Sequence, residues 1–110
     1  MERPDGRFAS LLAWARERLG EPLTVDQLAE KAAMSPRNFA RRFLAETGLT
    51  PARAIERLRV ESARERVEGT AEAIEGIAQS AGFGDPERMR RAFVRAFGQP
   101  PQALRRVARA

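Results

Sequence analysis

Cysteine, histidine and tyrosine are all absent from this chain of 110 residues. Without cysteine there are no disulfides or thiolate sites, and without histidine the chain lacks the most frequent zinc ligand and the most frequent general base. No glycine-rich phosphate loop occurs either. We therefore expect no catalytic residues, no metal site and no cofactor, and the composition fits a reducing cytosol.

Long apolar runs are absent too. No segment approaches the ~18 apolar residues that a membrane-spanning helix needs, and the N-terminal residues MERPDGR contain no apolar signal core. The sequence therefore predicts a cytoplasmic protein with no membrane partner. Its length favours one domain, which we expect to be monomeric in isolation.

Basic residues outnumber acidic ones, giving a net charge of +5, and all but one of the 20 basic residues are arginine. A GC-rich genome also favours arginine and alanine, so composition alone leaves nucleic-acid binding undecided. The distribution is more informative. Arginines outnumber carboxylates in residues 36–47 and 86–97, whereas carboxylates dominate the segments that precede them. Positive charge is thus concentrated on two segments, as expected for elements that face DNA.

These two segments belong to an internal repeat. Residues 28–48 (LAEKAAMSPRNFARRFLAETG) align with residues 77–98 (IAQSAGFGDPERMRRAFVRAFG) at a spacing of 49 residues, which becomes 50 after one extra residue in the second copy. Alanine meets alanine at 29 and 78, phenylalanine meets phenylalanine at 43 and 93, and glycine meets glycine at 48 and 98. The chain is therefore a tandem pair.

Each copy has the features of a helix-turn-helix unit. A small residue, Ala33 or Gly82, allows a sharp turn after the first helix. An acceptor side chain and a proline then begin the second helix, at positions 35–36 and 85–86, where the N–H that proline lacks would have no partner anyway. Gly48 or Gly98 ends it. In a bound unit of this kind the second helix lies in the DNA major groove.

Five further helices are expected, which makes the fold all-α with about seven helices. Periodicity predicts a first helix from Phe8 to about Leu19, and the capping box of Thr24 and Gln27 begins another that runs to about residue 33. Thr70 is expected to cap a helix that runs to about residue 81. The predicted organisation is a linker remnant (1–7), a first helix-turn-helix subdomain (8–50), a connecting helix (51–68) and a second helix-turn-helix subdomain (69–110) that ends in a short helix beginning at Pro101.

A helical wheel separates the two faces of the second helices. The inward positions are Phe39, Ala40, Phe43 and Thr47 in one copy and Met89, Phe93, Ala96 and Phe97 in the other. Base stacking by the phenylalanines is conceivable, but their matched helical spacing favours a core. The candidate DNA contacts on the outward faces are Arg37, Asn38, Arg41 and Arg42 in the first copy and Glu87, Arg88, Arg91 and Arg95 in the second.

Base-edge chemistry gives these side chains different roles. Arg37 and Arg88 suit the O6/N7 edge of guanine, Asn38 suits adenine, and Glu87 suits a cytosine amino group. Outside the two helices, Trp14 could stack on a partner, although plain packing is favoured. For the C-terminal arginines 105, 106 and 109, phosphate contact and a frayed basic terminus both stay open.

Several motifs together resemble the DNA-binding domain of the AraC/XylS family of bacterial transcription regulators over roughly residues 8–107. These motifs are the tandem copies, Arg-x-Phe in each second helix, Gly-x-x-Pro after each, Gly82-Phe83, and Arg59-Val60-x-x-Ala63-Arg64. The chain departs from the family pattern at Arg66 (usually apolar), Met89 (usually aromatic) and Leu104 (usually tyrosine or phenylalanine). The sequence SPRNFARRF resembles that of the family branch whose sensor is an amidase-like (DJ-1/PfpI-type) domain. In the family a sensor domain would normally precede residues 1–7.

The resemblance implies transcription control by binding double-stranded DNA, with RNA polymerase as a further partner if the protein is an activator. It also implies that the two second helices enter successive major grooves. The alternative from a different class is a helical protein-interaction module whose basic faces bind an acidic partner. An enzyme is not expected.

Overall fold

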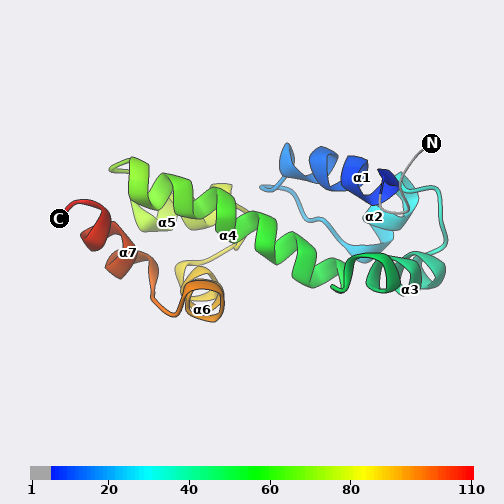
Figure 1. Cartoon of the computed structure of the whole chain (residues 1–110). Helices are drawn as coiled ribbons and strands as arrows, with labels where there is room; N and C mark the ends of the chain where they lie inside the picture. The colour runs from blue at the N-terminus through cyan, green and yellow to red at the C-terminus, as the bar shows by residue number, and fades with distance from the viewer. Residues whose placement is uncertain (1–5) are drawn as a thin grey trace. The chain divides into compact units, whose positions relative to one another are not determined.

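The computed structural model describes residues 6–110, which form seven α-helices and, within that range, no strand. The all-α prediction is confirmed. The predicted linker remnant lies mostly outside the described residues, and its last two residues, Gly6 and Arg7, belong to the first helix. The helices are α1 (Gly6–Arg16), α2 (Val25–Lys31), α3 (Pro36–Thr47), α4 (Pro51–Gly69), α5 (Ile74–Ser80), α6 (Pro86–Phe97) and α7 (Pro101–Ala108) (Figure 1).

The chain divides into two compact units, one extending to Ile55 and the other beginning at Glu56. The division falls inside α4, so the first turn of this helix belongs to the first unit and the remainder to the second. Each unit therefore contains one complete copy of the helix-turn-helix repeat.

Three phenylalanine rings form the centre of the first unit. Phe8 of α1 lies against Phe39 and Phe43 of α3, with ring centroids 5.8 and 5.1 Å away, and the centroids of Phe39 and Phe43 are 5.5 Å apart. All three side chains are buried, together with Leu28 and Ala29 of α2. The prediction that Phe39 and Phe43 face a core is confirmed, and stacking on bases is excluded by their burial.

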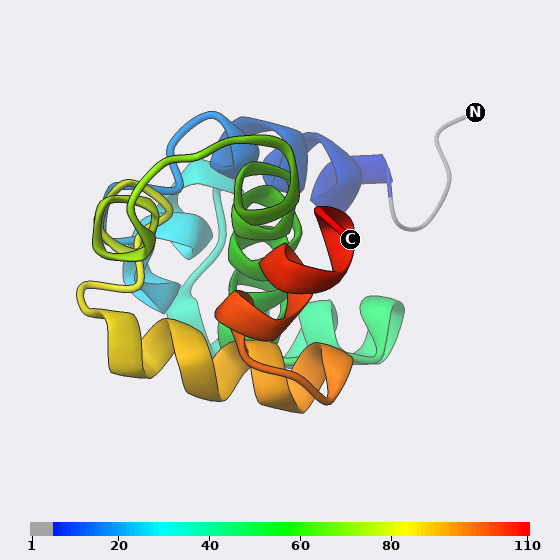
Figure 2. The ribbon, with the colours of Figure 1, turned by 90° about the vertical axis from the view of Figure 1, so that its left-hand side faces the viewer.

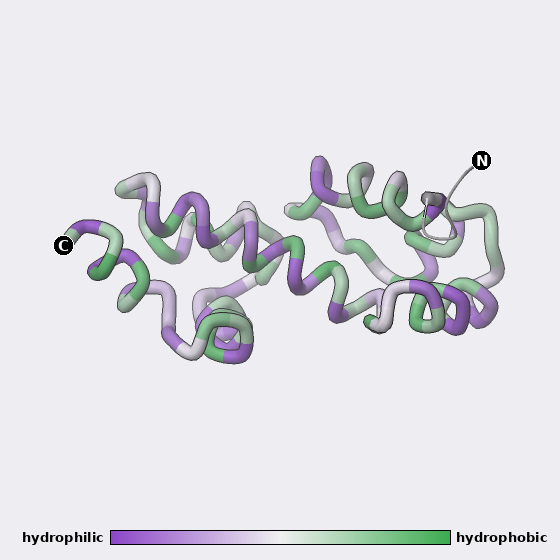
Figure 3. Tube along the Cα trace, viewed as in Figure 1, coloured by the Kyte–Doolittle hydropathy of each residue, from purple (hydrophilic) through white to green (hydrophobic). Residues whose placement is uncertain are grey.

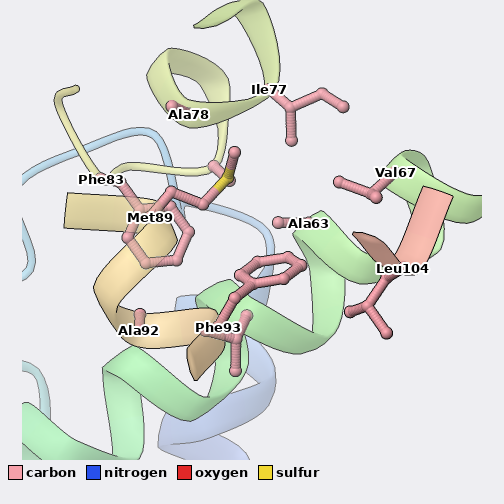
Figure 4. Packing of buried hydrophobic residues seen from close by; sticks show 11 residues of the cluster. Ala63, Val67, Ile77, Ala78, Phe83, Met89, Ala92, Phe93 and Leu104 are labelled. Carbon is pink, nitrogen blue, oxygen red and sulfur yellow. The ribbon is translucent and has the colours of Figure 1, made fainter. Parts of the chain in front are cut away.

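The core of the second unit is built around the C-terminal part of α4, onto which α5, α6 and α7 pack (Figure 2). Met89 and Phe93 of α6 are fully buried, and Leu104 of α7 completes the cluster (Figure 4). The expected inward position of Ala96 is wrong. Ala96 is exposed, whereas Ala92, one turn earlier, is buried and Phe97, the next residue, packs against the cluster.

Both helix-turn-helix turns have the same backbone form. Ala33 and Gly82 have positive φ values of 59° and 91°. The next residue in each copy donates its N–H to the carbonyl of the small alanine in the preceding helix: Met34 to Ala29 and Phe83 to Ala78, each at 2.9 Å. The extra residue of the second copy is accommodated at Gly84, which also has a positive φ of 88°.

Local capping determines where α3 and α6 begin and end, and both ranges are as predicted. Ser35 Oγ accepts the N–H of Asn38 at 3.3 Å, and Asp85 Oδ1 accepts that of Arg88 at 2.8 Å. At the other end Gly48 and Gly98 are left-handed, as the C-terminal glycine of a helix commonly is.

Two helix boundaries differ from prediction. Helix α1 ends at Arg16 rather than near Leu19, because Glu17 and Arg18 donate to carbonyls three residues back, which tightens the last turn. Thr70 does not cap α5, which begins at Ile74 after Ala73. Instead Thr70 closes α4, since both its N–H (3.0 Å) and its hydroxyl (2.7 Å) donate to the carbonyl of Arg66.

Candidate nucleic-acid interface

Helices α3 and α6, here called the recognition helices, each bury one side and expose a charged one. Hydrophilic and hydrophobic positions alternate along both (Figure 3). Every predicted contact residue except Asn38 is exposed, and Asn38 is half-buried. The structure therefore places the predicted residues on the accessible surfaces of the two recognition helices.

In α3, Arg41 is held by a neighbour on the same helix. Its Nη2 donates to Asn38 Oδ1 at 2.9 Å. Adenine readout by an asparagine uses the side-chain oxygen as acceptor and the amide nitrogen as donor. The oxygen of Asn38 thus accepts one hydrogen bond from Arg41, while its second lone pair and the amide N–H groups are left for other partners. Arg42 makes a looser pair with Glu46, at 3.4 Å.

In α6, one carboxylate organises two arginines. Glu87 accepts from Arg90 at 2.7 and 2.9 Å and from Arg91 at 3.4 Å. The hydrogen bond from Arg90 lowers the pKa of Glu87 to about 2, from an ordinary value of 4.5, and the same pair raises the pKa of Arg90. Glu87 is therefore ionised at neutral pH and already engaged. Arg90 was not among the predicted contacts, although its spacing of three residues from Glu87 predicts a pair on one helical face.

Arg91 and Arg41 occupy equivalent positions of the repeat, and each has a side-chain oxygen one turn earlier. The acceptor is a neutral amide in α3 and a carboxylate in α6. Each recognition helix thus carries an arginine at the same position of the repeat, but the two arginines have different electrostatic environments.

Arg95, also predicted to contact DNA, pairs with a residue of α4. Its guanidinium donates to both carboxylate oxygens of Glu56, at 2.9 and 3.3 Å. Arg88 lies 3.8 Å from Asp85. All of these pairs are exposed, and such surface pairs contribute little to stability, so a phosphate group can compete for the arginines.

The C-terminal arginines have structural partners that the sequence did not suggest. Arg105 Nε donates to the carbonyl of Val67 at 2.9 Å, and Arg109 Nη2 donates to that of Thr70 at 2.7 Å. Both therefore fasten α7 to the C-terminal end of α4, and a frayed terminus is wrong for these two residues. Arg106 is exposed.

Arg66, which departs from the expected apolar residue, forms part of a polar network beside this junction. Its guanidinium donates to Glu72, at 3.0 Å for Nε, and also to Ser80. The hydrogen bond from Arg66 lowers the pKa of Glu72 to about 2. Glu72 lies in the loop before α5.

Trp14 is half-exposed and lies between two cations of its own unit. The guanidinium of Arg18 is 4.7 Å and the ammonium of Lys31 is 5.2 Å from its ring. This arrangement agrees with packing, the favoured alternative. Across residues 6–110, no group of three or more acidic side chains could hold a metal ion. In the same range, no helix combines the length and the apolar character needed to span a membrane.

Comparison with known proteins gives one family. Residues 28–107 match the family described as "Helix-turn-helix domain". The chain is 44% identical over 92 residues to the HTH-type transcriptional regulator Rv1931c of Mycobacterium tuberculosis, covering 84% of this chain and 36% of that protein. It is 33% identical over 104 residues to the HTH-type transcriptional activator RhaS of Escherichia fergusonii, covering 94% and 37%. The chain thus spans little more than a third of these relatives.

Solved structures share the fold. The DNA-binding domain of the global transcriptional factor AdpA, solved in complex with a target DNA, superposes with a TM-score of 0.87 at 36% identity, covering 94% of this chain and 93% of that domain. An AraC-type regulator from Chromobacterium violaceum superposes with a TM-score of 0.85 at 22% identity, covering 93% and 91%. At that lower identity the likeness concerns the fold alone.

Proposed function

This chain belongs to the AraC-type family of helix-turn-helix transcription regulators, and we propose that it binds double-stranded DNA sequence-specifically through both recognition helices. The observation that carries the proposal is the duplicated turn, with equivalent caps and an exposed arginine-bearing face in each copy. The AdpA domain, whose structure contains DNA, supports it. The function follows from binding, and no catalytic step is assigned to the chain.

We assign the contacts by chemistry. Arg41 and Arg91 make the strongest base or phosphate contacts, and Arg37 and Arg88 address guanine edges. Arg42 and Arg95 are suited to phosphates once their carboxylate partners are displaced. Glu87 accepts from a cytosine amino group if it releases one arginine. Asn38 orients Arg41, and its second lone pair and amide N–H groups suit adenine.

The larger context is also a proposal. Subdomains 8–50 and 69–110, joined by residues 51–68, would place the recognition helices in successive major grooves, in the cytoplasm of a bacterium. The likeness to RhaS activators favours RNA polymerase as a further partner. The SPRNFARRF wording favours an amidase-like (DJ-1/PfpI-type) sensor in the whole protein. The isolated domain would act as a monomer, since one chain already carries both recognition helices.

Selection of bound duplexes from a random pool tests the proposal. We expect an asymmetric site with two half-sites about one helical turn apart, ~10 bp, bound by one molecule and preferred over scrambled duplexes. Binding should weaken steeply with salt, because arginines release phosphate counterions. An interaction module for an acidic partner would weaken with salt as well, but it would show no preference among duplexes.

An insertion of ~5 bp between the half-sites tests the use of both helices at once. It turns the second groove to the far side of the duplex, where DNA bending recovers contact only at high cost. Affinity should fall towards that of a single unit, whereas an insertion of ~10 bp restores the face and alters only the distance. Unchanged affinity after the ~5 bp insertion, or a palindromic site bound by two chains, would refute binding by both units of one molecule.

A further inference from the structure

Large apolar side chains are rarely exposed on this chain. Among residues 6–110 they are Leu44, Val94 and Val107, which are 48%, 41% and 68% exposed. Two of the three, Leu44 and Val94, occupy equivalent positions of the repeat, one on each recognition helix. An aliphatic residue is therefore exposed at the same position of two surfaces that are otherwise dominated by charge.

Neither side chain belongs to the core of its unit, although about half of each is covered. The neighbouring Phe43 and Phe93 point into the cores and are at most 1% exposed. The backbone carbonyls of Leu44 and Val94 accept the N–H of Gly48 and Gly98 at 2.9 Å, but this cap needs no side chain. Burial and capping therefore give no reason for a leucine or a valine at these positions.

The helical spacing aligns both side chains with the proposed DNA contacts. Leu44 follows Arg41 by three residues and Arg37 by seven, and Val94 follows Arg91 by three. Residues three, four and seven apart lie on one face of a helix. The aliphatic side chain is thus the next exposed group along the face that carries the arginine.

The major groove displays one apolar group, the C5-methyl of thymine, which aliphatic side chains contact. We propose that Leu44 and Val94 each contact a thymine methyl group beside the base addressed by Arg41 or Arg91. This inference rests on the proposed function and adds two specificity residues to it. Protein docking sites on monomers are usually contiguous apolar patches of a few hundred Å², whereas here each aliphatic side chain stands singly beside arginines.

Replacement of thymine by deoxyuridine tests the inference, because it removes the methyl group and leaves base pairing intact. The probe is the duplex that this chain selects from a random pool, with each thymine replaced in turn. We expect one position in each half-site at which the substitution weakens binding about fourfold, the effect of returning one methyl group to water.

Alanine variants then assign each methyl group to its side chain. Leu44→Ala should abolish the sensitivity to deoxyuridine in one half-site, and Val94→Ala should abolish it in the other. Val107→Ala is the matched control, since Val107 is also apolar and exposed but lies on α7, and it should leave both sensitivities intact. None of the three side chains belongs to a core, so melting temperatures should change by no more than about 4 °C.

The outcomes separate the inference from the function on which it rests. If the parent binds its selected site specifically and no thymine is sensitive, or if the sensitivities persist in the alanine variants, the inference is wrong and DNA binding stands. If no duplex is preferred over scrambled ones, the proposed function fails, and the inference fails with it.

Discussion

Ala33 and Gly82 occupy the same place in the two copies of the repeat, and both have a left-handed backbone, with φ values of 59° and 91°. Each is followed by a residue whose N–H closes the turn onto the preceding helix at 2.9 Å. One turn geometry is thus built from alanine in the first unit and from glycine in the second. For alanine this conformation is unfavourable by roughly 1–2 kcal/mol.

Ala33→Gly should stabilise the first unit by up to about 1 kcal/mol, because removing the steric cost outweighs the extra freedom of glycine in the unfolded chain. Gly48→Ala should have the opposite effect, of about 1 kcal/mol. Gly48 has a φ of 79°, and no atom lies within 4 Å of the place that an alanine methyl group would occupy, so the cost is conformational only. Urea denaturation measures both. A destabilised Ala33→Gly would show that the methyl group of Ala33 contributes packing that outweighs strain.

Phe43→Ala and Phe93→Ala should each lower the free energy of unfolding by ~3–5 kcal/mol, because each empties a fully buried ring site. The adjacent exposed positions provide controls, since Leu44→Ala and Val94→Ala should change it by no more than about 0.5 kcal/mol. Thermal or urea unfolding checks the result. A Phe variant that melts like the parent and loses only DNA binding would contradict the assignment to the core.

Arg41→Ala and Arg91→Ala should each weaken specific DNA binding by ~1–3 kcal/mol and relax base preference in a different half-site. Arg106→Ala removes the same charge from α7, so it should leave base preference unchanged. Binding to a panel of single-base variants of the selected site measures this. The assignment to separate half-sites fails if both substitutions alter preference at the same base pairs.

Asn38→Asp tests whether Asn38 orients Arg41 or reads a base. Aspartate keeps an acceptor for Arg41 Nη2, so the base preference of Arg41 should survive while overall affinity falls with the added negative charge. Asn38→Ala removes the acceptor and should relax that preference. If Asn38→Asp instead abolishes a preference for adenine, direct readout by Asn38 is the correct account.

Glu72→Gln should lower the melting temperature at neutral pH, because the carboxylate pairs with Arg66. The pKa of Glu72 is about 2 in the folded chain against an ordinary 4.5. A lowered folded-state pKa means that the stabilisation is complete above about pH 4.5 and is lost as the pH falls towards 2. The difference between parent and variant should therefore vanish near pH 2. Glu65→Gln, at an exposed position in the interior of α4, is the control and should leave the melting temperature at neutral pH unchanged.

The ranges of α3 and α6 could be predicted from the sequence because their signals are local. A capping side chain, a proline and a terminal glycine lie within or beside each helix, and the repeat provided a second copy of the same pattern. The inward phenylalanines followed from the same periodicity. These features depend on residues at most a few positions apart.

The errors have two sources, namely local hydrogen bonds that compete with a predicted cap and contacts between distant segments. Threonine is a common N-cap residue, but the hydroxyl of Thr70 donates to the carbonyl of Arg66 instead. The loop before α5 is therefore longer than expected. Arg95 donates a hydrogen bond to Glu56, which is 39 residues away in the sequence, and Arg105 donates to the carbonyl of Val67, which is 38 residues away. Neither pair leaves a periodic signal in the sequence. The surface of α6 could thus be located in advance, but not the residue of α4 that pairs with Arg95.

The carboxylate partners of the arginines on α6 have a kinetic consequence. On α6 the arginines at 88, 90, 91 and 95 all lie within 4 Å of a carboxylate, whereas on α3 Arg37 pairs with no acidic side chain of residues 6–110. A phosphate competes with each carboxylate for its arginine, and this competition is the same on every sequence. We therefore expect the unit that contains α6 to dwell more briefly on random DNA than the unit that contains α3. Its full affinity should develop only where matching base edges compensate for the exchanged ion pairs.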